Sequence, residues 1–218
     1  MLRRFFAPIH LDGLKFVGVG ALATLLFFLL WAPAGWAAGF VTLWMAYFFR
    51  DPWRVTPIRE GLLISPADGI VVSIGPATPP PELVMGDEAV VRIGIFLNIF
   101  DVHVTRGPVG GRVAAMRYTK GRFVNASLDK ASEDNERLAI RIAPPDGPDV
   151  AFVLIAGLVA RRIVCNVQEG QSVCRGDRFG IIRFGSRVDV YLTETARVTV
   201  TAGQTVRAGE TVLAEFRN

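Results

Sequence analysis

The chain has 218 residues, enough for one domain and an appendage, and 51% of them are hydrophobic. A soluble domain is rarely so apolar, and the excess is concentrated in the first fifty residues. The formal net charge is +4, which suits a nucleic acid or an anionic membrane as partner. No basic stripe with interleaved aromatic residues is present, so we expect no nucleic-acid partner.

Two uncharged apolar runs, Phe16–Trp31 and Trp36–Phe49, flank a break at Ala32–Gly35. As helices they would reach about 24 Å and 21 Å, short of a hydrocarbon core of about 30 Å. Basic residues precede the first run and follow the second, so the positive-inside rule places both ends in the cytoplasm. We predict a helical membrane hairpin over residues 1–60. The alternative, a cleaved signal peptide, lacks a convincing cleavage site before a polar segment.

From Ile64 onward, short alternating runs separated by Gly, Pro and Asp predict strands, with short helical turns at 98–102 and 127–135. One internal repeat is present, because Gly170–Gly176 (GQSVCRG) recurs as Gly203–Gly209 (GQTVRAG). Glycines at these offsets permit turns with positive φ, and the valine between them packs inward. Small flattened β-sandwiches of the lipoyl-carrier type use this pattern. We therefore predict that residues 61–218 form a mainly β domain with a lipoyl-like flattened β-sandwich (barrel-sandwich hybrid) core.

Two non-catalytic functions fit parts of this pattern. Asp129–Lys130–Ala131 is similar to a lipoyl attachment site, but the following stretch, Ser132–Arg137, is too polar for the strand that such a lysine needs. The other is a non-enzymatic envelope adaptor, a membrane anchor that bears a lipoyl-like domain. Such adaptors usually insert a long coiled coil, and the sequence has no heptad run. Cys165 and Cys174 have no four-ligand zinc spacing and are expected to be reduced thiols, with a disulfide as the alternative.

Three short segments carry candidate chemistry, although each is also an ordinary structural pattern. His103 lies among β-branched residues, Asp68 precedes a glycine, and Gly185–Ser186 connects two expected strands. The G-x-S-x-G motif is absent, which disfavours an ordinary serine hydrolase. If Asp68 meets His103, it can orient the imidazole, and His103 can then take a proton from a serine.

Six blocks in order together resemble phosphatidylserine decarboxylase proenzymes of the short-chain bacterial and archaeal type. Any one block is weak, but together they span nearly all of the chain after the hairpin. The blocks are Ser65–Gly69, Phe100–Pro108, Gly121–Ala126, Asp129–Arg137, Gly157–Ile163 and Arg175–Ser186. Under this resemblance Lys130 belongs to a family block. Two positions depart from the longer relatives: Arg106 stands where they carry a second histidine, and Arg187 stands where a small polar residue is common.

The resemblance implies an enzyme that makes its own pyruvoyl group by cutting itself. Ser186 Oγ would attack the carbonyl of Gly185 to form an ester, with His103, oriented by Asp68, as the base. Elimination would leave dehydroalanine, and hydrolysis would give the pyruvoyl group and ammonia. The products would be a β chain, residues 1–185, and an α chain, residues 186–218, which stay together as a heterodimer.

The resemblance also implies the reaction. The pyruvoyl group at position 186 would form a Schiff base with phosphatidylserine and accept electrons as CO₂ leaves, giving phosphatidylethanolamine. No metal or diffusible cofactor is expected. The hairpin would hold the catalytic domain on the cytoplasmic side of the inner membrane, beside its lipid. Arg50 and Arg54 are expected to fix topology, with attraction of the anionic head group as the alternative. Another pyruvoyl-dependent amino-acid decarboxylase is a further alternative, but a soluble substrate would leave the anchor unexplained.

Overall fold

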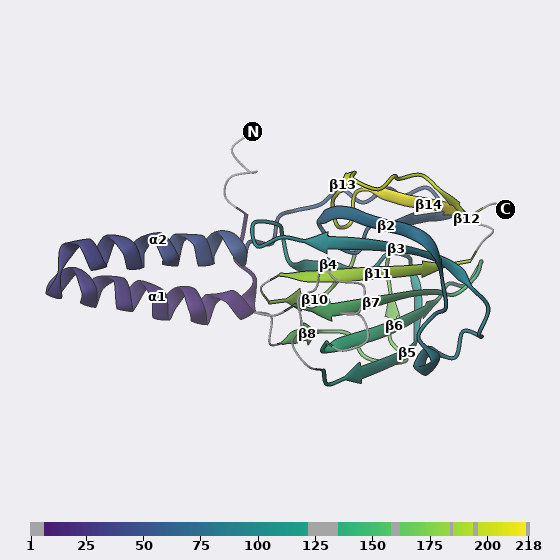
Figure 1. Ribbon diagram of the computed structural model, residues 1–218, viewed down its shortest axis with the longest axis horizontal. Coiled ribbons are helices and arrows are strands. Elements are labelled where there is room, and N and C mark those ends of the chain that lie inside the picture. Colours follow the sequence, from purple (N-terminus) through teal and green to yellow (C-terminus); the bar gives the residue numbers. More distant parts are fainter. Residues whose placement is uncertain (1–6, 122–134, 158–161, 184, 194–195, 217–218) are drawn as a thin grey trace. The chain divides into compact units, whose positions relative to one another are not determined.

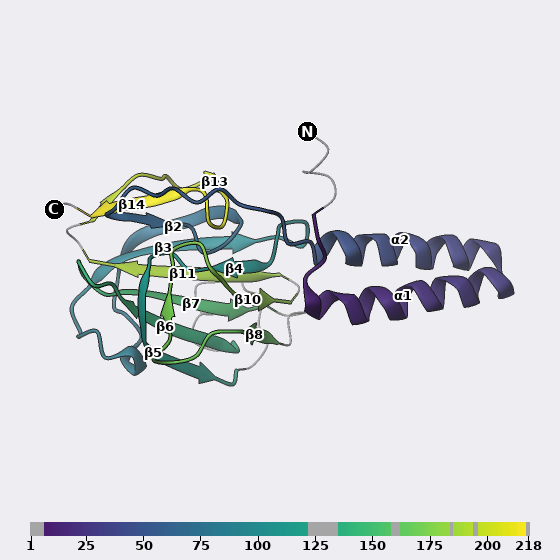
Figure 2. The same ribbon diagram turned by 180° about the vertical axis from the view of Figure 1, so that it is seen from behind.

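The computed structural model describes residues 7–121, 135–157, 162–183, 185–193 and 196–216. The chain divides into two compact units, Met1–Trp53 and Arg54–Asn218, a boundary a few residues before the predicted one at residue 60. The first unit carries the helices and the second carries the strands (Figures 1 and 2). Lys130 and the predicted turn at 127–135, except for Asn135, lie outside the described residues. At residues 98–102 the chain forms a turn rather than a helix.

The helical unit contains α1 (Leu11–Leu30) and α2 (Ala32–Phe48), separated by the extended Trp31. The predicted break at 32–35 is therefore wrong by a few residues. Pro33 lies in the first turn of α2, where its missing N–H costs no helical hydrogen bond. The α1 helix begins five residues earlier than predicted, and its 20 residues rise about 30 Å. Helix α1 is thus long and apolar enough to cross a membrane.

The two helices pack closely through small side chains. A Cβ on Gly20 would lie only 2.7 Å from Met45 and Thr42. The hydroxyls of Thr24 and Thr42 are 3.1 Å apart across the interface. Close approach at small residues, with hydrogen bonds between helices, is how apolar helices associate in lipid.

The second unit is built from strands in three sheets. Its described elements are β1 (Leu62–Ile64), β2 (Gly69–Ala77), η2 (Pro81–Leu83), β3 (Val90–Leu97), β4 (Val104–Arg106), β5 (Gly111–Thr119), β6 (Arg137–Ala143), β7 (Val150–Ala156), β8 (Ile163–Cys165), β9 (Ser172–Val173), β10 (Arg178–Ile182), β11 (Ser186–Leu192), β12 (Ala196–Val198), β13 (Thr205–Val206) and β14 (Val212–Phe216). A curled eight-stranded sheet has the order β13-β2-β3-β11-β7-β6-β5-β9, and two three-stranded sheets have the orders β4-β10-β8 and β1-β14-β12. The prediction of a mainly β fold with N-terminal helices is confirmed.

The sequence repeat has a structural counterpart. Its two copies form β9 and β13, which lie at opposite edges of the eight-stranded sheet. Each copy is followed by the central strand of a three-stranded sheet, β10 or β14. The four repeat glycines, Gly170, Gly176, Gly203 and Gly209, have φ values of 89°, 86°, 87° and 78°. These are left-handed turn conformations that glycine adopts without steric cost, as the repeat predicted.

The strand domain has two halves, and one half is inserted into the other in the sequence. Strands β4 to β10 form the inserted half, which lies in the sequence between β3 and β11 of the first half. In the large sheet each half contributes four strands, and the halves meet at the β11–β7 pair. Side chains from all three sheets meet in one core, which includes Leu63, Ile95, Phe152, Phe179 and Leu213. The rings of Phe152 and Phe179 are 5.5 Å apart within it. Ser186, which begins β11, therefore lies where the inserted half ends and the first half resumes.

Candidate active site

The topology brings the three predicted residues to one end of the large sheet. Ser186 is the first residue of β11 and pairs with Leu97, the last residue of β3. Asp68 immediately precedes β2, whose first residues pair with the end of β3. His103 follows the turn that leaves β3. Because β2, β3 and β11 are adjacent, Asp68, His103 and Ser186 lie toward the same end of these strands.

Ser186 is fully buried in the middle of the large sheet. Leu97 pairs with it on one side, and Ala156, the last residue of β7, pairs with it on the other. Its Oγ is buried and has no hydrogen-bond partner among the described residues. Buried hydroxyls nearly always have a partner, so an exception calls for a chemical reason. The Ser186 hydroxyl is thus held in the sheet without a described hydrogen bond that a reaction at Oγ would have to break.

Gly185 presents its carbonyl to a hydrogen-bond donor. The backbone N–H of Gly157 donates to the Gly185 oxygen at 3.0 Å. Gly185 has a φ of 63°, and among the described residues other than its chain neighbours no atom lies within 4 Å of where a Cβ would stand. Glycine is therefore preferred for its backbone conformation and not for lack of space. A fixed N–H at a carbonyl oxygen stabilises the negative charge that develops there on nucleophilic attack.

Glu136 binds two residues on either side of Gly157 in the sequence, Ala156 and Ile163. Its backbone oxygen accepts from Ala156 N–H at 2.9 Å, and its carboxylate Oε1 accepts from Ile163 N–H at 3.1 Å. Glu136 is only 5% exposed. The sequence offered no sign of this role, because it depends on strands β6 and β7 lying side by side. Gly157 therefore directly follows Ala156, whose backbone is fixed in the sheet by pairing with Glu136 and Ser186.

His103 is fully buried, and its ring is oriented by the backbone. Nδ1 lies 3.0 Å from the carbonyl oxygen of Asp101, and the backbone oxygen of His103 accepts from Ile182 N–H. Because a carbonyl only accepts, Nδ1 carries a proton in this contact. A neutral imidazole then has its lone pair on Nε2, the form that a general base requires.

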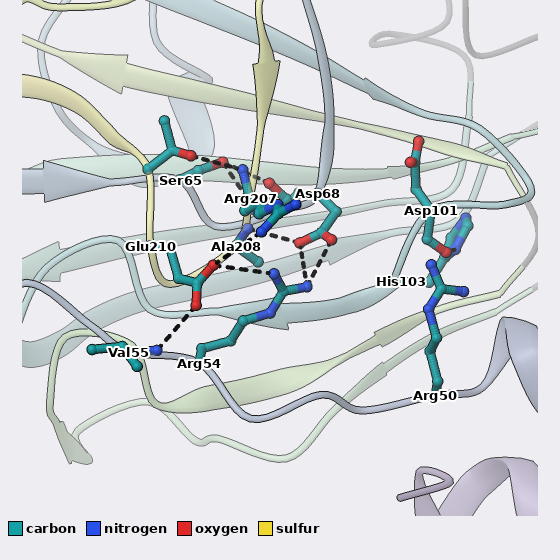
Figure 3. Close-up of polar contacts among 12 residues, drawn as sticks. Arg50, Arg54, Val55, Ser65, Asp68, Asp101, His103, Arg207, Ala208 and Glu210 are labelled. Atoms are coloured by element: carbon teal, nitrogen blue, oxygen red, sulfur yellow. Dashed lines mark hydrogen bonds and ion pairs between the residues drawn. The ribbon is translucent and has the colours of Figure 1, made fainter. Parts of the chain in front are cut away.

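Asp68 is bound by a neighbouring arginine. Both of its carboxylate oxygens accept from Arg54, at 2.9 and 2.7 Å, and Oδ1 also accepts from Ala208 N–H at 2.8 Å (Figure 3). Burial raises the pKa of the Asp68 carboxyl, whereas Arg54 and Ala208 oppose this, and the nearby charge of Asp101 adds to it. The described partners of Asp68 are thus Arg54 and Ala208, and its contact with His103 stays a prediction.

Two arginines have roles that the sequence did not reveal. The Arg54 side chain is 7% exposed and binds both Asp68 and Glu210, so it is not available as a surface charge. Arg106, at the position of the second histidine in longer relatives, is 6% exposed and donates to the Gly176 backbone oxygen at 3.0 Å. Both residues hold the loops around the site.

Arg187, Cys165 and Cys174 were also singled out in the sequence, and each has a different environment. Arg187 is buried and forms an ion pair with Asp189 at 2.6 Å. This pair compensates the buried arginine charge at the position where the resemblance leads one to expect a small polar residue. Cys165 and Cys174 are free thiols, and burial raises the pKa of Cys165. No group of three or more His, Cys, Asp or Glu side chains with metal-binding geometry occurs in the part of the chain that the structure describes.

Comparison with known proteins identifies the family. The family model described as phosphatidylserine decarboxylase matches residues 41–214. A phosphatidylserine decarboxylase proenzyme of Cereibacter sphaeroides is 56% identical over 215 residues, which are 99% of this chain and 93% of the relative. The proenzyme of Ruegeria pomeroyi is 54% identical over 98% of this chain and 97% of the relative. That of Paramagnetospirillum magneticum is 55% identical over 95% and 87%. With so much of both chains matched, this protein belongs to the phosphatidylserine decarboxylase family.

Proposed function

We propose that the chain cuts itself between Gly185 and Ser186 and that the product decarboxylates phosphatidylserine to phosphatidylethanolamine and CO₂. One observation carries the proposal. The bond lies between a carbonyl that accepts an N–H from Gly157 and a buried Ser186 hydroxyl without a described partner. The relatives' common name, proenzyme, supports a maturation step of this kind.

The first step is an acyl shift. His103 Nε2 takes the proton of Ser186 Oγ, and Oγ attacks the carbonyl carbon of Gly185. Gly157 N–H stabilises the negative charge on the Gly185 oxygen. The C–N bond then breaks as the nitrogen of Ser186 takes up a proton. An ester joins the Gly185 carbonyl to Ser186 Oγ, and the α-amine of residue 186 is free.

The second step is elimination. Loss of the Cα proton of residue 186 breaks its Cβ–Oγ bond, and Gly185 leaves as a carboxylate that keeps the serine oxygen. The dehydroalanine at position 186 tautomerises to an imine, and water converts it to a ketone with release of ammonia. The products are a β chain ending at Gly185 and an α chain that begins with a pyruvoyl group at position 186.

In the mature enzyme the pyruvoyl carbonyl supplies the electron sink for decarboxylation of an amino-acid head group. The chain's own residues hold that end in place. The backbone of β11 is paired with β3 and with β7, so the α chain stays in the sheet as part of a heterodimer. His103, whose ring is oriented by the Nδ1 contact with Asp101, would return a proton to the substrate carbon through Nε2. Asp68, held by Arg54, contributes negative charge at the same end.

The helical unit supports a location at the membrane. The apolar α1 is able to cross a bilayer, and basic residues flank the hairpin in the sequence. By the positive-inside rule the catalytic unit lies on the cytoplasmic side of the inner membrane. Such anchoring confines enzyme and lipid to one surface and raises their effective concentration. A soluble amino acid as substrate would give these helices no role.

Intact-mass analysis of the purified protein tests the proposal. We expect two chains separated after residue 185, with the smaller one carrying the mass of a pyruvoyl end. Ser186→Ala should stay in one piece and release no CO₂ from phosphatidylserine. A wild-type chain that stays uncut while active, or a Ser186→Ala chain that still cuts, would refute the proposal.

A further inference from the structure

Two apolar residues occupy the centre of an exposed turn beside the site. Asp101 N–H donates to the Asn98 oxygen at 3.0 Å, which closes a β-turn over residues 98–101. The central positions are Ile99, 44% exposed, and Phe100, 57% exposed. Turn centres usually carry Gly, Pro, Asn, Asp or Ser, because these residues favour the required backbone. A β-branched and an aromatic residue here do not serve the turn.

The first and last residues of the turn, Asn98 and Asp101, stabilise it through their own side chains. Asn98 Oδ1 accepts from Phe100 N–H at 2.7 Å, and Asp101 Oδ2 accepts from Asn98 N–H at 2.9 Å. Side chains of Asn and Asp commonly form such local bonds. The side chains at positions 99 and 100 are therefore held outward on a rigid base.

The same turn positions His103. The carbonyl oxygen of Asp101 faces Nδ1 of His103 at 3.0 Å. The two outward apolar side chains and the inward imidazole thus belong to one short segment. Whatever Ile99 and Phe100 bind is brought next to the reacting end of the sheet.

The rest of this end has the composition of a membrane-facing surface. Tyr118, 52% exposed, lies near the end of β5, and Lys120 and Arg162 are also exposed. Strand β5 ends on the same side of the large sheet as β3, because Thr119 pairs with Arg137 and Arg137 pairs with Ile155 next to the end of β7. Aromatic and basic residues are typical of contacts with anionic lipid head groups.

We propose that Ile99 and Phe100 insert into the acyl region of an anionic phospholipid leaflet and so present a lipid head group to His103 and Ser186. This inference rests on the proposed function, because the substrate is then a lipid. Within the strand unit, Arg54 binds Asp68, whose carboxylate lies at this end of the large sheet. The turn therefore adds a contact with the leaflet at the place where the substrate must arrive.

The double substitution Ile99→Ser and Phe100→Ser tests this surface. The matched control is Val84→Ser, which removes a 77% exposed apolar side chain from a turn outside the site. Decarboxylation is measured on phosphatidylserine in mixed vesicles and on dihexanoyl phosphatidylserine below its micelle concentration. We expect the double variant to lose at least about tenfold in rate on vesicles and less than about twofold on the monomeric lipid, because two apolar side chains no longer enter the leaflet.

Self-cleavage, followed by intact mass, should be complete in all three proteins. An unchanged rate on vesicles would overturn the inference, as would an equal loss on both substrates, because the turn would then act only through His103. If the wild type neither cuts nor decarboxylates either lipid, the proposed function itself has failed, and this outcome is distinct from the other two.

Photo-crosslinking gives a direct check. Wild-type protein in vesicles that contain a diazirine-acyl phosphatidylcholine should carry label on the peptide with residues 98–101. The residue 84 peptide should carry none. Label found only on α1 and α2 would contradict the proposal that the 98–101 turn inserts into the leaflet.

Discussion

The backbone N–H of Gly157 donates a 3.0 Å hydrogen bond to the carbonyl oxygen of Gly185. Gly157 follows the end of β7, which is the strand that pairs with the start of β11. The donor and the carbonyl are therefore held by adjacent strands before any reaction begins. A donor fixed in advance need not reorganise when charge develops on the oxygen.

Gly185→Ala should slow self-cleavage by about tenfold. Its φ of 63° costs a non-glycine residue about 1–2 kcal/mol, so the backbone leaves this conformation and the carbonyl leaves Gly157. Space is not the cause, because beyond its chain neighbours no atom that the structure describes lies within 4 Å of the new Cβ. Gly185→Asn, which tolerates this conformation better, should cut faster than the alanine variant. Equal rates in all three chains, followed by gel electrophoresis after synthesis, would contradict the role of this geometry.

Glu136→Leu should slow self-cleavage by about tenfold or more. The change leaves the buried N–H of Ile163 without its acceptor, at a cost of about 1–3 kcal/mol, and removes one of the two Glu136 contacts that flank Gly157 in the sequence. Glu136→Gln keeps an oxygen for Ile163 and should cut nearly as fast as wild type. The measurement is the cut fraction over time, with thermal unfolding as a check that each chain folds. A fast leucine variant, or a glutamine variant as slow as leucine, would exclude the positional role.

His103→Asn should reduce the rate of self-cleavage by about 10²–10⁴-fold, the usual contribution of a general base. Asparagine keeps an N–H for the carbonyl of Asp101 and so preserves the turn, but it has no basic nitrogen. The control is His10→Asn, because His10 is the other histidine of the chain and caps α1 through Asp12. Cleavage of His103→Asn at the wild-type rate would show that another group is the base.

Arg54→Met should move the acid limb of the pH–rate profile of self-cleavage to higher pH by about one to three pH units. Burial raises the pKa of Asp68, and Arg54 opposes it, so loss of Arg54 lets the carboxyl take up its proton at higher pH. Arg59→Met removes an exposed arginine paired with Glu215 and is the control. An acid limb that stays in place would show that ionised Asp68 is not needed for the cut.

Asp68 also makes stability depend on pH. Its raised pKa means that the folded protein holds this proton more tightly than the unfolded chain, whose ordinary value is 3.8. The contribution of Asp68 to stability is therefore greatest below pH 3.8 and falls as the pH rises through the raised folded value. In the uncut Ser186→Ala background, Asp68→Asn should flatten this part of the curve of Tm against pH. A curve with the wild-type slope would contradict the raised pKa.

Sequence reasoning selects candidate groups by side-chain identity, and the roles of Ser186, His103 and Asp68 stay predictions. The fold adds that β2, β3 and β11, the strands next to these residues, are adjacent. The repeated glycines predict turns with positive φ, and the structure confirms these turns, because few residues other than glycine adopt that conformation.

The sequence could not locate groups that act through the backbone or through long-range register. Gly157 acts with its N–H, which every residue except proline has, and Glu136 acts because β6 lies beside β7. Arg54 looked like a surface charge after an apolar run, and only the fold shows it bound to Asp68. The start of α2 was misplaced because Pro33 was taken as a helix breaker although the first turn accepts it.

The nesting of the two halves would make the proposed cut after Gly185 a one-way event for folding. The α chain would contribute β11 to the middle of the large sheet and β14 to the middle of a smaller one, so the cut strands are enclosed on both sides. Before the cut, refolding is a reaction within one chain, and its rate does not depend on dilution. After the cut, unfolding releases two polypeptides, and recovery requires them to meet again at a rate proportional to concentration. The mature enzyme then persists by slow unfolding rather than by reversible recovery, and denaturation at low concentration inactivates it permanently.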